Sequence, residues 1–246
     1  MTGKKLRLYP LPAQELLGES IYEDLELPPP GSRNPSRPYV IMNMVSSIDG
    51  RTARGGKASR IGSETDRRVM RTLRSKADAV MIGAGTLRAE KLSLGLDDPV
   101  GPQPLAVIVT SSGELPLENN LIVSEQQEVL VIAPEDITVH SGGVLRLSAD
   151  RSGNIDLTEA LRILNAEHAV DLLLVEGGPS LNYSLISQNL ADELFLTLAP
   201  KLLGGTLDES LAILDGPVLA TRDINLVSAH LAGGELFLRY SLAETA

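Results

Sequence analysis

The chain contains 246 residues, 43% of them apolar, and carries a formal net charge of −10 at pH 7. This length is enough for one large domain, or for one domain with an appendage, and for a hydrophobic core that is stable without disulfide bonds. The sequence has no cysteine and three histidines, so we expect no disulfide, no metal centre and a cytoplasmic protein. The acidic balance argues against nucleic-acid binding, and no apolar run is long enough to predict a membrane span.

Residues 1–37 are predicted to form an N-terminal extension that ends in a proline-rich linker. The stretch from Pro28 to Pro35 contains four prolines and one glycine, a composition that favours neither helix nor strand. The compact domain is therefore expected to span residues 38–246.

The first strand of that domain is predicted from Tyr39 to Val45, an apolar run interrupted by Asn43. A buried amide without a partner costs about 1–3 kcal/mol, so either neighbouring backbone or a ligand must pair with Asn43. The polar segment from Ser46 to Arg51 follows the strand. It is either a surface turn or the polar lip of a pocket at the end of the strand.

A helix is predicted from Glu64 to about Lys76, with Ser63 as its N-cap. It carries four arginines, namely Arg67, Arg68, Arg71 and Arg74. Most of them are expected to form a solvated basic face, but one that points into a cleft would bind an anionic substrate.

Two apolar strands run directly into glycine turns and helix starts. The strand around residues 170–175 is followed by Glu176, Gly177, Gly178, Pro179 and Ser180, and the strand around residues 79–82 by Gly83, Ala84, Gly85 and Thr86. Glycine lets another molecule approach the backbone closely, and a helix N-terminus offers free N–H groups to a phosphate. One such junction is often a plain turn, whereas two in one chain favour phosphate binding. A third strand, from Leu105, ends in the hydroxyls of Thr110 and Ser111, which either bind a ribose or turn the chain.

Strands separated by helices, followed by a β-rich C-terminus with a closing hairpin, predict an α/β fold. The central sheet should be mixed, mostly parallel and flanked by helices. A Rossmann fold fits poorly, because the first strand is followed neither by Gly-x-Gly-x-x-Gly nor by an acidic residue about 20 positions on.

Four segments, in this order and spacing, resemble the reductase domain of riboflavin biosynthesis. They are residues 44–51, residues 78–86, residues 175–181, and residues 191–194 with 199–205. The resemblance covers about residues 38–242. It implies a dihydrofolate-reductase-like fold, a homodimer that pairs through its sheet, and NADPH-dependent reduction of a ribosylaminopyrimidine 5′-phosphate, in which hydride transfer converts the ribosyl group to ribityl.

Position by position, the resemblance implies roles for the residues singled out above. Predicted NADPH contacts are Gly83, Ala84, Gly85, Thr86, Thr110, Ser111, Gly177, Gly178, Pro179 and Ser180. Predicted substrate contacts are Asn43, Ser46, Ser47, Arg51, Arg74 and Glu90, with Arg74 near the substrate phosphate. Glu176 and Asp49 are the candidate catalytic acids, although a purely positional role for either stays open.

The chain departs from the family pattern after the second glycine turn. The family commonly has Asp-Asp-Pro-x-Leu-Thr-x-Arg there, whereas this chain reads Glu90 to Asp97, in which Glu90 replaces the first aspartate and the Pro, Thr and Arg are absent. The zinc motif of the accompanying deaminase domain is also missing. Two alternatives therefore stay open: an NADPH-dependent reductase of another pteridine- or folate-like substrate, and a non-catalytic nucleotide-binding relative.

Overall fold

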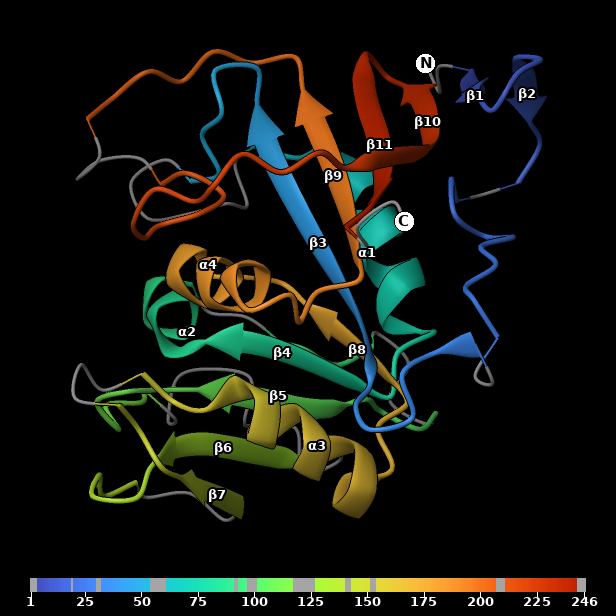
Figure 1. Ribbon diagram of the computed structural model, residues 1–246. Helices are drawn as coiled ribbons and strands as arrows, with labels where there is room; N and C mark the ends of the chain where they lie inside the picture. Colours follow the sequence, from blue (N-terminus) through green and yellow to red (C-terminus); the bar gives the residue numbers. More distant parts are fainter. Residues whose placement is uncertain are drawn as a thin grey trace.

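The computed structural model describes residues 4–18, 20–29, 32–53, 61–90, 93–96, 101–116, 127–139, 143–150, 154–206 and 211–242. Its strands are β1 (Lys5–Tyr9), β2 (Gln14–Leu16), β3 (Tyr39–Ser47), β4 (Ala79–Gly83), β5 (Leu105–Val109), β6 (Val129–Pro134), β7 (Gly143–Leu147), β8 (Leu172–Val175), β9 (Glu193–Ala199), β10 (Asn225–Ala232) and β11 (Glu235–Ser241). Its helices are α1 (Glu64–Arg74), α2 (Ala84–Ala89), α3 (Leu157–His168) and α4 (Pro179–Ser187). The strands form one sheet in the order β2-β1-β10-β11-β9-β3-β8-β4-β5-β6-β7 (Figure 1).

Two kinds of strand pairing divide this sheet. The neighbours from β9 through β3, β8, β4, β5 and β6 to β7 pair in parallel, whereas β2, β1, β10, β11 and β9 pair antiparallel. The predicted α/β fold with a mixed, mostly parallel sheet is confirmed. Because parallel neighbours end at the same edge, the carboxyl ends of β4, β5 and β8 meet there, on the left in Figure 1.

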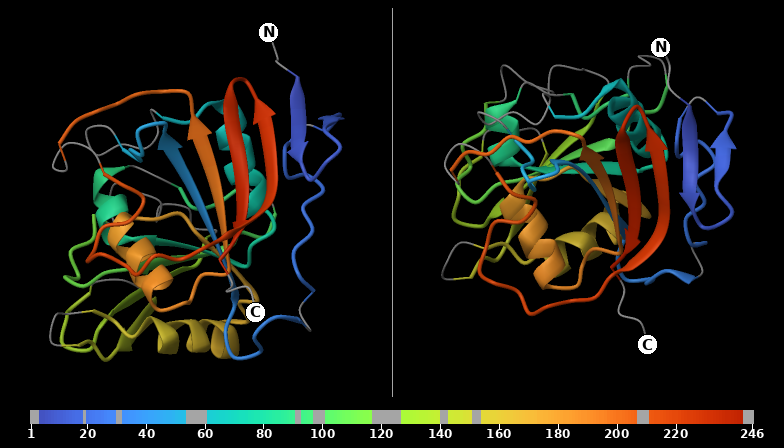
Figure 2. Two further views of the ribbon diagram at one scale, coloured as in Figure 1. Left: turned by 45° about the horizontal axis from the view of Figure 1, so that its top comes forward. Right: turned by 90° about the horizontal axis from the view of Figure 1, so that it is seen from above.

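Strand β3 shows why helices cover both faces of the sheet. Val40 and Met42 belong to the apolar cluster that includes residues of α3 and α4. Ile41, between them, packs in a second cluster with Val69 and Leu73 of α1. Successive side chains of a strand point to opposite faces, so an uninterrupted apolar run needs cover on each side. Figure 2 shows α1 on one side of the sheet and α3 and α4 on the other.

The structure confirms two local predictions, the N-cap of α1 and the hairpin at the C-terminus. Helix α1 begins after Ser63, whose Oγ accepts hydrogen bonds from the backbone N–H groups of Thr65 and Asp66. The C-terminal strands β10 and β11 form a hairpin that turns at Gly233 and Gly234, with φ of +59° and +86°. A two-residue hairpin turn with positive φ at both positions is one that glycine adopts without strain.

The N-terminal extension adds to the sheet. Strand β1 pairs antiparallel with β10, and β2 lies at the outer edge. Ile21 and Tyr22 are buried in the core cluster of α1, whereas Leu17 is exposed. The predicted boundary at residue 37 stays a prediction. Residues 54–60, which the sequence suggests form a glycine- and lysine-containing loop before α1, lie outside the described residues. Within the described part of the chain, no helix is long and apolar enough to cross a membrane.

Candidate active site

The two glycine turns predicted from the sequence lie side by side. Strands β4 and β8 are hydrogen-bonded neighbours, and the backbone N–H of Gly83 donates to the carbonyl of Gly177 over 2.8 Å. A Cβ atom at Gly178 would lie 3.0 Å from Oγ1 of Thr86, which is tighter than most real contacts. The two turns thus approach most closely at Gly178, where a side chain would crowd Thr86.

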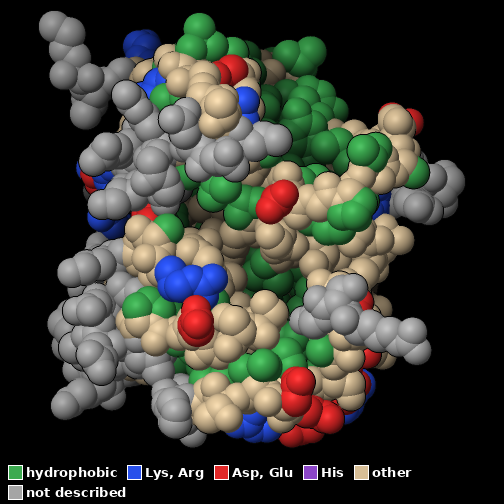
Figure 3. Space-filling view, turned by 90° about the vertical axis from the view of Figure 1, so that its left-hand side faces the viewer, with side chains coloured by type: hydrophobic (Ala, Val, Ile, Leu, Met, Phe, Trp, Pro, Cys, Tyr) green, Lys and Arg blue, Asp and Glu red, His purple; other side chains and the backbone are tan. Residues whose placement is uncertain are grey.

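Three adjoining pockets form a continuous cleft at this edge of the sheet. The outer pocket, about 270 Å³, lies between the end of β5 and the starts of α2 and α4. The central pocket, about 300 Å³, lies over the two glycine turns, and the inner pocket, about 360 Å³, lies between β3 and α1. Gly85 and Ser180 line both the outer and the central pocket, and Thr86 and Glu176 line both the central and the inner pocket. Figure 3 views this edge and shows it hollowed, with apolar side chains in its floor.

All ten predicted cofactor residues line the outer or the central pocket. A Cβ atom built at Gly85 would meet nothing within 4 Å, so the backbone there is open to a ligand. Helix α4 begins with Pro179 and has no side-chain cap, which leaves N–H groups of its first turn available to an anion. These features fit an extended dinucleotide whose diphosphate lies at the glycine turns.

Glu176 forms a buried ion pair with Arg74. The guanidinium donates to both carboxylate oxygens, over 2.7 Å from Nε and 2.6 Å from Nη2, and the two side chains are 11% and 6% exposed. Arg74 also donates to the backbone carbonyls of Ser93 and Gly95. The arginine predicted to contact a substrate phosphate is therefore already paired with a carboxylate, which neutralises the charge that it would offer. Arg74 thus positions Glu176 and the 93–95 segment, and because it also lines the inner pocket its predicted contact with the substrate stays a prediction.

Asp49 lies outside the cleft. Its carboxylate accepts hydrogen bonds from Ser47 Oγ over 2.6 Å and from the backbone N–H groups of Leu203 and Gly204. The Ser47 hydroxyl and then these two N–H groups lower the pKa of Asp49 to about 2. A group that is ionised at neutral pH and lies away from the pockets is unsuited to donate a proton, so the structure does not support Asp49 as a catalytic acid.

The other predicted residues of this lip also lie away from the pockets. Ser46 is buried and donates to the carbonyl of Ser47, and Ser47 Oγ accepts from the backbone N–H of Arg51. Arg51 donates to the carbonyl of Gly205. The polar segment after β3 therefore ties its own turn to the 201–205 loop, and the structure does not bring these three residues to the cleft.

Asp49→Asn should destabilise the folded protein at neutral pH and lose this effect in acid. Interactions that lower a carboxyl pKa stabilise the folded state above the unfolded pKa of about 4. That stabilisation disappears as the pH falls through the folded value of about 2. Thermal unfolding at pH 7 and at about pH 2.5 checks this prediction. An equal difference between variant and wild type at both pH values would contradict it.

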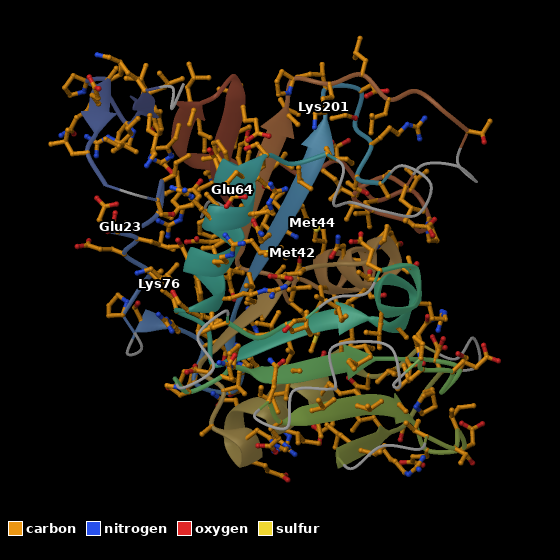
Figure 4. The ribbon with its side chains drawn as sticks, turned by 180° about the vertical axis from the view of Figure 1, so that it is seen from behind. Glu23, Met42, Met44, Glu64, Lys76 and Lys201 are labelled. Carbon is orange, nitrogen blue, oxygen red and sulfur yellow. The ribbon has the colours of Figure 1, made fainter. Side chains whose placement is uncertain are left out.

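The inner pocket brings together Asn43, Glu90, Arg74 and Glu176 from the predicted set. It also contains Asp66, which the sequence reading missed as a site residue. Asp66 occupies the third position of α1, where an acidic residue is ordinarily explained by the N-terminal turn, but its carboxylate accepts a hydrogen bond from the Thr197 side chain of β9. The sequence did contain one signal for this role: Ser63 already caps the helix, so Asp66 is not needed as a cap. Figure 4 shows Glu64 at the start of α1, and Met42 and Met44 on β3.

Burial raises the pKa of Asp66 to about 6. The Thr197 hydrogen bond opposes this shift, and the nearby carboxylate of Glu235 adds to it.

Among the described residues, no group of three or more His, Asp or Glu side chains is arranged to hold a metal ion.

Known proteins are similar to this chain in sequence and in fold. The family described as RibD C-terminal domain matches residues 38–231. A protein of Archaeoglobus fulgidus named 2,5-diamino-6-ribosylamino-4(3H)-pyrimidinone 5′-phosphate reductase is 33% identical over 194 residues, which cover 73% of this chain and 87% of that protein.

Two solved structures share the fold at 24% sequence identity. RibD of Acinetobacter baumannii aligns with a TM-score of 0.69 over 84% of this chain and 58% of its own. A diaminohydroxyphosphoribosylaminopyrimidine deaminase/5-amino-6-(5-phosphoribosylamino)uracil reductase of Thermotoga maritima aligns with a TM-score of 0.65 over 83% of this chain and 56% of its own. This chain thus spans little more than half the length of these two proteins. Since the family match runs from the start of β3 into β10 and takes in both glycine turns, the chain belongs to the RibD C-terminal domain family.

Proposed function

We propose that this chain is a cytoplasmic, NADPH-dependent reductase that converts the ribosyl group of a ribosylaminopyrimidine 5′-phosphate to ribityl in riboflavin biosynthesis. The observation that carries this proposal is the continuous cleft, in which two paired glycine turns adjoin an inner pocket that contains Glu176. The name of the Archaeoglobus relative supports the same reaction.

The residues of the outer and central pockets fit the cofactor. The glycine turns and the first turn of α4 would hold the diphosphate, and Thr110 and Ser111 would lie beside the adenosine ribose. When bound, the nicotinamide supplies the hydride that is added to C1′.

The inner pocket would hold the substrate. Met44, Val45 and Ile82 contribute apolar walls to this pocket, and the Arg74 pair holds Glu176 at the boundary with the central pocket. The ring oxygen that leaves C1′ takes up one proton. Both oxygens of Glu176 accept from Arg74, so we assign Glu176 to orienting the ribosyl group, and the proton to a water molecule.

Arg88→Gln should reduce the preference for NADPH over NADH. Arg88 lines the outer pocket beside Ser111 and Ser112, and this cation and two hydroxyls suit the 2′-phosphate that distinguishes NADPH. Because a charge-assisted hydrogen bond contributes about 1.5–3 kcal/mol, we expect kcat/KM for NADPH to fall about 10- to 100-fold and that for NADH to stay nearly constant. Steady-state kinetics with both cofactors check this prediction, and an equal loss for both would contradict it.

The test of the proposed function is NADPH oxidation with a ribosylaminopyrimidine 5′-phosphate, compared with dihydrofolate. Turnover of the pyrimidine phosphate and formation of a ribityl product would support the proposal. Turnover of dihydrofolate instead would favour a pteridine reductase. Saturable NADPH binding without turnover of either substrate would favour a nucleotide-binding relative.

We also propose that the protein is a homodimer. The antiparallel half of the sheet carries β9 and β11, whose apolar residues are predicted to lie beneath a partner subunit, and the family resemblance implies pairing through the sheet. Sedimentation at micromolar concentration tests this proposal, and a monomer would overturn it.

A further inference from the structure

Asp66 is a carboxylate in the lining of the inner pocket, a slot between β3 and α1 whose exposed lining is more apolar than polar. The inner pocket is walled by Met44, Val45, Met70 and Ile82, and Asp66 is a partly buried polar group in its lining. Thr197 supplies a side-chain hydrogen bond, and no ion pair of Asp66 occurs among the described residues. A flat apolar ring with hydrogen-bond donors on one edge suits such a slot, because a desolvated carboxylate is stabilised by donors.

The charges around Asp66 exclude a phosphate as its partner. Glu235 of β11 is buried and contributes negative charge, as does Glu176 at the end of β8. Two cations of α1 also line this pocket. Arg74 is paired with Glu176, and Arg67, which donates to the exposed Glu64, lowers the pKa of Asp66 less than burial and Glu235 raise it. A dianionic phosphate beside these three carboxylates would be repelled. Glu90 also lines this pocket and adds a further carboxylate.

The position of Asp66 along the cleft limits which part of a substrate it meets. Glu176 and Thr86 line both the inner and the central pocket, whereas Asp66 is among the lining residues of the inner pocket alone. The reacting carbon must lie near the central pocket, where the nicotinamide would bind. Asp66 is therefore placed to contact a part of the substrate remote from the reacting carbon, and the heterocyclic base is the part that carries N–H donors.

We propose that Asp66 accepts two hydrogen bonds from a pyrimidine edge that carries adjacent N3–H and 2-amino donors, and that it thereby selects a 2-aminopyrimidinone over the corresponding uracil. This inference rests on the proposed function. A carboxylate presents two acceptors and matches two parallel donors, as it does with arginine. A uracil presents a carbonyl oxygen at C2 instead of the amino group, so one carboxylate oxygen would face an acceptor.

Asp66→Asn tests the proposal, because an amide offers one acceptor and one donor and so matches the uracil edge. The two substrates are 2,5-diamino-6-ribosylamino-4(3H)-pyrimidinone 5′-phosphate and 5-amino-6-(5-phosphoribosylamino)uracil, the compounds named for two relatives. We expect the wild type to prefer the diamino compound, and the ratio of the two kcat/KM values to fall at least about 100-fold in the variant. A wild type without this preference, or an unchanged ratio in Asp66→Asn, would overturn the proposal.

Further variants test whether the effect of Asp66→Asn comes from recognition of the pyrimidine, from a loss of folding or from the loss of one negative charge. Glu167→Gln makes the same kind of chemical change at an exposed position of α3, outside the three pockets, and should leave the ratio unchanged. Asp66→Ala removes both acceptors and should lose the diamino substrate without gaining the uracil. NADPH titration of each variant verifies that the protein is folded, since Asp66 does not line the central or outer pocket. If the wild type reduces neither compound, the proposed function itself fails. If it reduces both with an unchanged ratio in the variant, the role of Asp66 alone fails.

The pH profile gives a second readout. The pKa of Asp66 is about 6, so the acceptor form should be lost, and kcat/KM for the diamino compound should fall, as the pH drops through this value. The substrate phosphate also titrates near pH 6, but it is common to wild type and variant. Any part of the fall in kcat/KM at low pH that is present in the wild type and absent in Asp66→Asn is therefore caused by the protonation of Asp66. The same fall in both proteins would count against the proposal.

Discussion

Glu176→Gln should abolish most of the activity and destabilise the folded protein. The substitution keeps the shape of the side chain but leaves the guanidinium of Arg74 without its carboxylate, at a site where the two side chains are 6% and 11% exposed. Removing one partner of a buried ion pair typically costs about 3–5 kcal/mol. Because Glu176 lines both the inner pocket, proposed for the substrate, and the central pocket, proposed for the cofactor, we expect kcat to fall at least about 100-fold, as it does when groups in an active site are misplaced.

The affinity for NADPH should change much less than kcat in this variant. Most of the proposed cofactor contacts are backbone groups of the glycine turns and of α4, which the substitution leaves in place. Equal losses in turnover and in NADPH affinity would identify Glu176 as a cofactor ligand instead. Stopped-flow turnover and NADPH fluorescence titration measure the two quantities separately.

Glu193→Gln is the matched control for this prediction. Glu193 forms a second bidentate ion pair, with Arg239, over 2.7 Å for each of two hydrogen bonds, and these side chains are 5% and 12% exposed. Glu193 lines none of the three pockets. The control should therefore lose a similar free energy of unfolding while the folded enzyme keeps its turnover. A similar loss of kcat in both variants would show that lower stability, rather than the position of Glu176, explains the effect.

Gly85→Val should remove cofactor binding without weakening the fold. A Cβ atom at this position meets no other atom within 4 Å, so the side chain enters open space in the cleft. Valine also favours helix slightly more than glycine, so the midpoint of thermal unfolding should stay constant or rise. In the cleft the added methyl groups occupy the space proposed for the diphosphate. Overpacking costs about 1–3 kcal/mol, so we expect the Kd for NADPH to rise about 10- to 100-fold.

Ala166→Val on α3 controls for placing valine in a helix, since Ala166 is exposed and outside the three pockets. Because valine favours helix less than alanine, this control lowers helix stability where Gly85→Val does not. NADPH titration and thermal unfolding of both variants check the prediction. Unchanged NADPH affinity in Gly85→Val would show that the diphosphate does not approach this turn, and the proposed cofactor site would have to be abandoned. A loss of affinity in the control would show that the assay reports helix stability instead.

The sequence by itself determined the elements and the two glycine turns, because their signals are local. The apolar run at β8 is long enough for a strand buried on both faces, and the glycines that follow it end the strand within a few residues. The cap at Ser63 and the hairpin turn at Gly233 likewise depend on neighbouring residues alone. Since both glycine turns follow parallel strands, their meeting at one edge could also be expected.

Only the tertiary structure decided the partners of the charged side chains. Arg74 pairs with Glu176, 102 positions away, and Asp49 accepts from Gly204, 155 positions away. Asp66 is close to Thr197 because β9 lies next to β3 in the sheet. Local sequence does not specify such pairs, because they depend on which strands become neighbours and on how far each side chain is buried. For the same reason, Arg74, which the sequence suggested as a phosphate ligand, is paired with a carboxylate, and Asp66, which looked like part of a helix start, lines the inner pocket.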